Sequence, residues 1–263
     1  MISHVRAILL FTRRQLETLR LKLVGFEIDR TVLNVSEDVG RSIYLYGGFE
    51  REEVRFLEAN VKADDTCFDV GANIGYFSLL MAKLAPRGTV HAFEPVPSNF
   101  HLLSTNVMLN QFTNVHRNAL AISDAPGSAE FTIAADGAYS SFIDTKRKLV
   151  QSKFIVAMTS LDAYCEANAI ARIDCLKVDV EGAEGKVIAG ASRLLSDPSR
   201  RPRLIIMELY NPMLTMYGTS IQAIVSILAG YGYQPKVERE AGTLSPLTPE
   251  EFDVHYNVFF LPS

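Results

Sequence analysis

The middle of the chain alternates short apolar runs with amphipathic stretches. Apolar runs rich in β-branched and aromatic residues predict strands, and the stretches between them predict helices. The expected strands are 66–70, 89–93, 114–119, 174–180 and 203–209, and the expected helices are 74–84, 99–109 and 182–195. This order is typical of a parallel sheet with helices on both faces, so we predict an α/β fold.

Three further segments extend this pattern. Two β-like runs, 129–134 and 154–158, predict a hairpin inserted at one edge of the sheet. The C-terminal part predicts a helix at 220–229 and a final strand pair at 233–237 and 254–261, joined by a long loop.

Basic residues lie among spaced apolar residues over 5–24, which predicts an amphipathic helix. We favour a helix packed on its own domain with a solvated basic face, and the alternative is contact with a membrane surface or a partner. The expected organisation is an N-terminal helical extension, 1–40, and a main domain, 41–263.

The composition is that of a soluble globular protein, with 48% hydrophobic and 21% charged residues in 263. The formal net charge of −4 argues against a nucleic-acid substrate, because phosphate backbones require a basic surface. No apolar run approaches the roughly 20 residues of a membrane span, and no signal-peptide pattern is present, so we expect a cytoplasmic protein. Cys67, Cys165 and Cys175 lack CxxC spacing and are expected to be buried thiols.

The first expected strand runs into a turn that contains glycines, Asp69-Val70-Gly71-Ala72-Asn73-Ile74-Gly75. Open α/β sheets bind ligands at such strand ends, where glycine permits close backbone approach. Glu94 ends the second strand, and its carboxylate can accept hydrogen bonds from both hydroxyls of a ribose.

The same turn discriminates between two cofactor classes. The GxGxxG pattern of dinucleotide sites is absent, since positions 73 and 76 are Asn and Tyr. Asp69 would repel a pyrophosphate but suits the ammonium of an amino-acid cofactor, which favours S-adenosylmethionine. The structural alternative is that Asp69 and Asn73 merely cap the next helix.

Three motifs, residues 68–78, 92–95 and 173–184, occur in an order that resembles the FkbM family of class I S-adenosylmethionine-dependent methyltransferases. The resemblance runs from about residue 40 to the C-terminus and includes the element at 47–50. It implies a Rossmann-like sheet of seven strands with an antiparallel last strand, S-adenosylmethionine as cofactor, and O-methylation of a hydroxyl on a sugar, glycan or other small natural product. The cofactor-binding residues that it implies, with their motif neighbours, are Asp69, Gly71, Ala72, Asn73, Gly75, Ser78, Glu94, Pro95, Asn118, Ala119 and Asp179.

The catalytic candidates lie at the ends of later strands. Methyl transfer to an alcohol is an in-line displacement, which a positioned base can assist. Asp179 or Glu181 is the expected base, and Lys177, on the same strand face as Asp179, holds charge or geometry. His255, at the start of an antiparallel last strand, is a second candidate base, or a solvent-exposed loop histidine. The structural alternative is that Glu181 and Glu184 cap the following helix and that Lys177 neutralises a buried carboxylate, and for Glu184 we favour this alternative.

Other functions stay open at this point. Asp179, Glu181 and Glu208 could hold magnesium or calcium, but their spacing matches no compact metal loop, so we predict no metal. A nicotinamide-dependent oxidoreductase uses the same kind of sheet, and a non-catalytic cofactor-binding scaffold would keep the same motifs.

Overall fold

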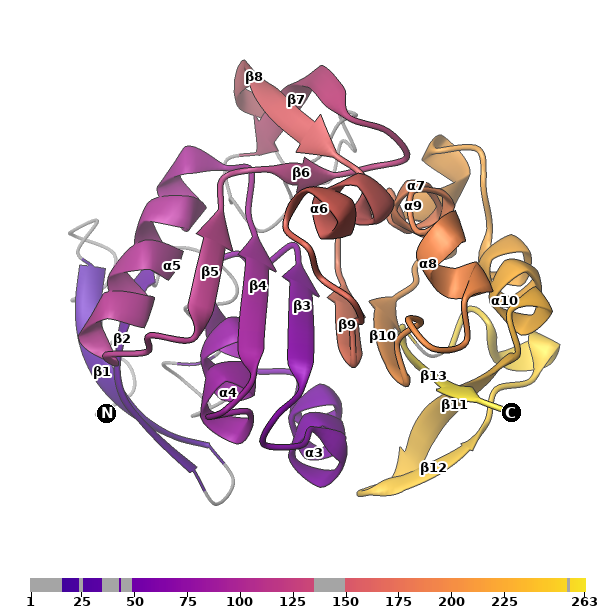
Figure 1. Ribbon diagram of the computed structural model, residues 1–263, viewed down its shortest axis with the longest axis horizontal. Helices are drawn as coiled ribbons and strands as arrows, with labels where there is room; N and C mark the ends of the chain where they lie inside the picture. Colours follow the sequence, from indigo (N-terminus) through magenta and orange to yellow (C-terminus); the bar gives the residue numbers. More distant parts are fainter. Residues whose placement is uncertain (1–15, 24–25, 35–42, 44–48, 135–149, 255) are drawn as a thin grey trace, which may run out of the picture.

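A central sheet positions every candidate residue. The computed structural model describes residues 16–23, 26–34, 43, 49–134, 150–254 and 256–263. Five parallel strands form one side of the eight-stranded sheet, up to the edge strand β5 (Figure 1). They are β3 (Thr66–Val70), β4 (Thr89–Phe93), β5 (Val115–Asn118), β9 (Cys175–Val178) and β10 (Leu204–Glu208). The strand order β12-β11-β13-β10-β9-β3-β4-β5 reverses between β3 and β9, which is the point where such sheets bind ligands.

The far side of the sheet is antiparallel. β13 (Asn257–Pro262) pairs antiparallel with both β10 and β11 (Tyr233–Glu240), which confirms the expected antiparallel last strand. β12 (Thr243–Pro246) adds an eighth strand inside the expected long loop. The reversal from β11 to β12 passes through Gly242 at φ 81°, a backbone conformation that suits glycine.

Alternation along the strands divides the apolar core into two layers. On one face, Cys67 of β3 packs with α3 (Arg51–Asn60), α4 (Tyr76–Leu84) and α5 (Pro97–Leu109). On the other face, Phe68 belongs to a cluster that includes apolar residues of the remaining helices. These are α6 (Leu161–Ala167), α7 (Glu184–Ala189), α8 (Ser192–Ser196), α9 (Asn211–Met216) and α10 (Ile221–Gly230); a short 3-10 helix, Pro249–Glu251, precedes β13.

The single helix expected over 182–195 is two helices, α7 and α8, which are separated at Gly190. A Cβ on Gly190 would lie 2.2 Å from the carbonyl oxygen of Ser123, so this glycine lets the chain pass close to a neighbouring segment. The three cysteines are free and buried, as expected.

The inserted segment forms a sheet of its own above the carboxyl edge of the main sheet (Figure 1). β7 (Gly127–Ala134) and β8 (Val150–Thr159) pair antiparallel, as the hairpin prediction requires. The short strand β6 (Ala121–Ile122) pairs with β8. The hairpin therefore covers the carboxyl ends of the main-sheet strands and does not extend the main sheet.

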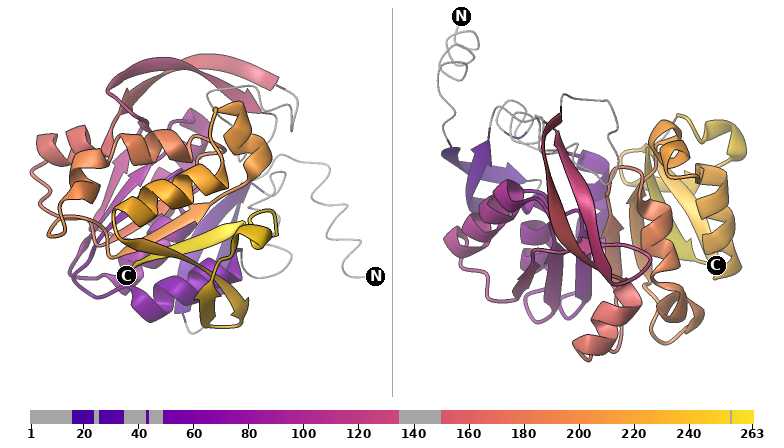
Figure 2. Two further views of the ribbon diagram at one scale, coloured as in Figure 1. Left: turned by 90° about the vertical axis from the view of Figure 1, so that its right-hand side faces the viewer. Right: turned by 90° about the horizontal axis from the view of Figure 1, so that it is seen from above.

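The N-terminal helix prediction is wrong where the structure describes the chain. Residues 5–15 lie outside the described residues, but β1 (Leu16–Leu23) and β2 (Phe26–Asn34) form an antiparallel hairpin. Residues 19–23 alternate leucine with Arg20 and Lys22, which is the two-residue period of a strand. This hairpin lies beside α5 (Figure 2). None of the helices in the described part of the chain is long and apolar enough to cross a bilayer.

Candidate functional site

The turn after β3 brings three strand ends together. The N–H groups of Gly71 and Ala72 both donate to the carbonyl of Phe93, at 3.0 and 2.9 Å, which ties the turn to β4. The N–H of Asp179 donates to the carbonyl of Val70 at 2.9 Å, which ties it to β9. A Cβ on Gly71 would lie 1.8 Å from the carbonyl oxygen of Asp179, and its φ is 87°, so only glycine fits.

A cavity opens above this turn, between the main sheet and the inserted sheet. It encloses about 570 Å³ of free space, part of which is open to solvent. Its lining combines the turn, the end of β4, the segment around β6, one residue of β7 and the end of β9: Val70, Gly71, Asn73, Phe93, Glu94, Pro95, Val96, Asn99, Leu120, Ala121, Ile122, Phe131, Asp179, Val180 and Glu181.

Glu94 is held rigidly in this cavity. One carboxylate oxygen accepts the N–H of Asn73 and the other accepts the N–H of Val96, both at 2.8 Å. Burial raises the pKa of Glu94 to about 7, although both hydrogen bonds oppose the shift. Each oxygen keeps a lone pair for a further donor. Asn73 adds a side-chain oxygen that is buried and has no hydrogen-bond partner among the described residues.

Asp69 and Ser78 lie behind the turn. The Ser78 hydroxyl donates to Asp69 at 2.5 Å, both side chains are buried, and neither lines the cavity. Burial raises the pKa of Asp69. Gly75 brings α4 against α5, since a Cβ there would lie 2.6 Å from Cδ1 of Leu103. In this structure these residues support the turn, and their direct contact with a cofactor stays a prediction.

Asn118 is fixed beside the cavity rather than in its lining. Its amide donates to the carbonyls of Ala92 and His116, and its oxygen accepts the hydroxyl of Tyr164 at 3.1 Å. Neither Asn118 nor Ala119 is among the lining residues.

The sequence analysis did not predict the apolar wall of the cavity. Val96, Ala121 and Phe131 pack together, with Ile122 lining the cavity next to them. The apolar run from Ala119 to Ile122, which follows β5, is the signal that could have marked it.

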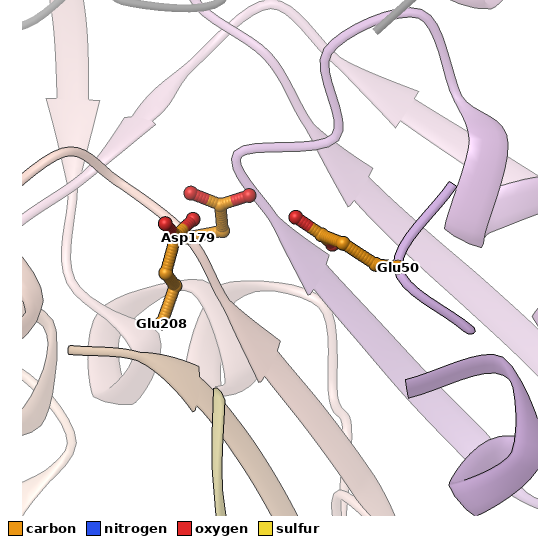
Figure 3. A group of neighbouring side chains, drawn as sticks. All are labelled: Glu50, Asp179 and Glu208. Atoms are coloured by element: carbon orange, nitrogen blue, oxygen red, sulfur yellow. The ribbon is translucent and has the colours of Figure 1, made fainter. Parts of the chain in front are cut away.

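Three carboxylates converge next to the cavity, at the ends of β9 and β10 and before α3. One oxygen from each of Glu50, Asp179 and Glu208 lies within 4.8 Å of the other two, and Figure 3 shows Glu50 facing the other two side chains. Close approach of the Asp179 charge, together with burial, raises the pKa of Glu208 well above its ordinary value. Sequence reasoning found Asp179 and Glu208 but assigned no role to Glu50, although it noted the element at 47–50.

Lys177 lies below this cluster, fully buried. Its Nζ is 3.2 Å from Asp179 Oδ2, which confirms the shared strand face, and 3.7 Å from Glu53 Oε2. The ammonium also sits 4.6 Å from the centre of the Phe77 ring. Burial alone would lower the pKa of Lys177, but Asp179 and Glu53 raise it well above its ordinary value, so the side chain stays charged.

A second, smaller hollow adjoins the first. Asp179 and Glu181 line both hollows. Glu184 accepts the N–H groups of Val180 and Gly182 at 3.2 and 3.1 Å, so it holds the turn that precedes α7 instead of capping the helix as predicted. Tyr210 also lines the smaller hollow, and its ring packs edge-on against Tyr256. The candidate base His255 lies outside the described residues.

Comparison with known proteins agrees with this geometry. A family model described as the methyltransferase FkbM domain matches residues 69–235. The chain is 27% identical, over 70% of its length and 79% of the relative, to 31-O-demethyl-FK506 methyltransferase FkbM of Streptomyces tacrolimicus. It is 28% identical, over 71% of its length and 72% of the relative, to hexuronic acid methyltransferase AglP of Haloferax volcanii.

Among solved structures, the chain is similar to methyltransferase FkbM from Methylobacillus flagellatus, with a TM-score of 0.47 and 16% identity. The match covers 76% of this chain but 44% of that longer chain.

Proposed function

We propose, from the premise that this chain belongs to the FkbM methyltransferase family, that it transfers a methyl group from S-adenosylmethionine to a hydroxyl oxygen of a sugar, glycan or other small natural product. The names of its relatives support this acceptor class, since one acts on a demethyl form of FK506 at a 31-O position and another on a hexuronic acid. The family match favours a methyltransferase over the nicotinamide alternative.

The observation that carries the proposal is the way in which the backbone fixes the Glu94 carboxylate in the lining of the cavity. Two backbone N–H groups hold its carboxylate in the cavity lining, so its free lone pairs can accept both hydroxyls of a ribose without reorganising. The unpartnered oxygen of Asn73 offers another acceptor, and the apolar wall with Phe131 and Ile122 suits an adenine ring. The residues therefore fit S-adenosylmethionine, which supplies an electrophilic methyl group on a sulfonium.

The acceptor hydroxyl is proposed to bind in the smaller hollow, because Asp179 and Glu181 line both hollows and so lie between cofactor and acceptor. Carboxylates accept hydrogen bonds from a polyol and orient one oxygen toward the methyl group. Asp179 or Glu181 takes the hydroxyl proton. Lys177, held 3.2 Å from Asp179, keeps that carboxylate in place.

Calorimetric titration with S-adenosylhomocysteine tests the cofactor, with NADH as the competing ligand. We expect micromolar affinity, about 8 kcal/mol, for the homocysteine product and no binding of NADH. Transfer of a labelled methyl group to a panel of hydroxylated sugars and polyketides then tests the acceptor class. Absence of homocysteine binding, or preference for NADH, contradicts the proposal. The cytoplasmic location stays a prediction.

A further inference from the structure

We propose that Glu50, Asp179 and Glu208 bind one divalent cation, of the hard, oxygen-preferring class of calcium, magnesium or manganese, and that this cation holds the acceptor hydroxyl. The second part rests on the proposed function, whereas the first does not. The sequence analysis predicted no metal, and the alternative that it weighed placed an ion between Asp179, Glu181 and Glu208. The site proposed here has Glu50 in place of Glu181.

The spacing of the carboxylates suits a single ion. Their three oxygens all lie within 4.8 Å of one another. Two oxygens on opposite sides of one ion are separated by at most twice the metal–oxygen distance, which is about 4.8 Å for calcium and about 4.2 Å for magnesium. The three oxygens are therefore close enough for one ion of this class to reach them together, with small side-chain movements that bring each to its metal–oxygen distance.

The three ligands come from parts of the fold that are held in place. Asp179 follows β9, Glu208 ends β10, and these strands are paired from Leu204 opposite Cys175 to Met207 opposite Val178. Glu50 immediately precedes α3 and faces the other two carboxylates (Figure 3).

A fourth carboxylate points independently to a missing cation. Glu53 is 1% exposed, and neither of its oxygens has a hydrogen-bond partner among the described residues. One oxygen of Glu50 is buried and lacks a partner in the same way. Glu50 and Glu53 also lie close enough to share a hydrogen bond, and burial raises the pKa of both carboxyl groups. Buried carboxyl oxygens without N–H or O–H donors from other residues are costly, and a bound cation would lower that cost.

The nearby lysine does not balance that charge. Lys177 contacts Glu53 and Asp179, at 3.7 and 3.2 Å. Within the described part of the chain, no ion pair joins a basic side chain to Glu50 or Glu208. A divalent cation bound between Glu50, Asp179 and Glu208 would supply two positive charges where four carboxylates meet one ammonium.

The place of the cluster gives the cation a function. Asp179 and Glu208 both line the smaller hollow, in which the acceptor is proposed to bind. A hydroxyl oxygen that coordinates a divalent cation is held in position, and its ionised form is favoured. This arrangement would also let an acidic hollow accept a negatively charged sugar, because the ion offsets the carboxylates.

Binding of manganese to the full chain, after removal of metals with EDTA, tests the site directly. We expect one saturable site by electron paramagnetic resonance, which calcium and magnesium compete for. Glu50→Gln and Glu208→Gln should each lower manganese affinity at least tenfold. Glu166→Gln is the matched control, because Glu166 is an exposed carboxylate in a surface pair with Arg193, and it should bind manganese as the parent chain does.

Two further readouts separate the possible failures. The melting temperature without metal should stay equal to that of the parent or rise in the Gln variants, since one repelling charge is removed, which shows that they fold. Homocysteine binding, measured in the same samples, tests the cofactor site independently of the metal. The site is overturned if none of the three ions binds saturably, or if all variants bind manganese with equal affinity. The carboxyl groups would then be stabilised by protons that they share with one another.

Discussion

Two groups of carboxylates lie at the same edge of the sheet, and their surroundings are opposite. Glu94 is buried, but each of its oxygens accepts a backbone N–H at 2.8 Å. Glu53 is equally buried, and neither of its oxygens has a hydrogen-bond partner in the described residues. Around Glu53 stand Glu50, Asp179 and Glu208, with Lys177 as the contacting cation.

The difference separates two kinds of recognition. A carboxylate fixed by main-chain donors is preorganised to accept hydrogen bonds from a neutral diol, because no side chain has to move when the ligand arrives. A group of carboxylates without donors keeps an electrostatic cost that a cation can relieve. The proposed cofactor side is thus built from hydrogen bonds, and the proposed acceptor side is built from charge.

Removing the ammonium of Lys177 should produce the largest effect. Lys177→Met leaves Asp179 and Glu53 without their cation in a buried position, and we expect a loss of about 3–5 kcal/mol in the free energy of unfolding. Urea denaturation at neutral pH measures it. Lys186→Met is the control, because Lys186 forms an exposed pair with Asp124 at 3.4 Å and should cost less than about 1 kcal/mol. Equal losses in the two variants would show that the buried carboxylates are not charged.

Gly71 lies between the cavity that Glu94 lines and the carboxylate cluster. Gly71→Ala should give the second-largest loss of stability. The new Cβ would lie 1.8 Å from the backbone oxygen of Asp179, so β3 and β9 must separate at their ends. We expect a loss of about 3 kcal/mol, together with loss of homocysteine binding. Gly218→Ala is the matched control, since Gly218 also has a positive φ, 74°, but no atom within 4 Å of the added Cβ. Its cost of about 1 kcal/mol isolates the backbone strain from the clash.

The cofactor side is tested at Glu94. Glu94→Ala removes the proposed acceptor of two ribose hydroxyls, and we expect about 100-fold weaker binding of S-adenosylhomocysteine by calorimetry, equivalent to about 2.7 kcal/mol. Manganese binding should persist in this variant, because Glu94 is not among the cluster residues. If the variant bound the homocysteine product like the parent, the ribose contact would be wrong.

The sequence predicted the lining of the cavity at Glu94 more completely than the carboxylate cluster at Glu50. The positions of Gly71, Asn73 and Glu94 in the cavity lining follow directly from two adjacent strands, since a strand that ends in a short turn places its next residues at the sheet edge. Glu50 and Glu53 reach the same edge only through packing of α3, which no local pattern specifies. The cavity wall at Phe131 depends in the same way on how the inserted hairpin folds back.

The N-terminal hairpin shows why a pattern can mislead. Leu16, Leu19 and Leu23 are spaced as on one face of a helix, whereas Leu19, Leu21 and Leu23 alternate as in a strand. Pairing decides between them, because Phe26–Asn34 supplies an antiparallel partner strand that pairs from Leu16 opposite Asn34 to Leu23 opposite Phe26, with one shift of register between Leu19 and Leu21. Local spacing carries no information about that partner.

The smallest expected change in stability is at Glu184. One of its carboxyl oxygens is hydrogen-bonded to the backbone, as in Glu94, and the other lacks a hydrogen-bond partner among the described residues, as in Glu53. One oxygen accepts two backbone N–H groups, the other has no partner, and burial raises the pKa to about 7. Since the folded state holds the proton more tightly than the unfolded chain, this stabilising contribution is complete below about pH 4.5 and is lost as the pH rises through about 7.

Glu184→Gln keeps the acceptor oxygen and removes the charge. We expect the variant to match the parent at pH 5 and to exceed it by about 2 kcal/mol at pH 8, in urea denaturation followed at both values. The gain should vanish gradually between them. A variant that is less stable than the parent at pH 8 would mean that the Glu184 carboxylate is charged and favourable there, as in the fully bonded setting of an N-terminal helix cap.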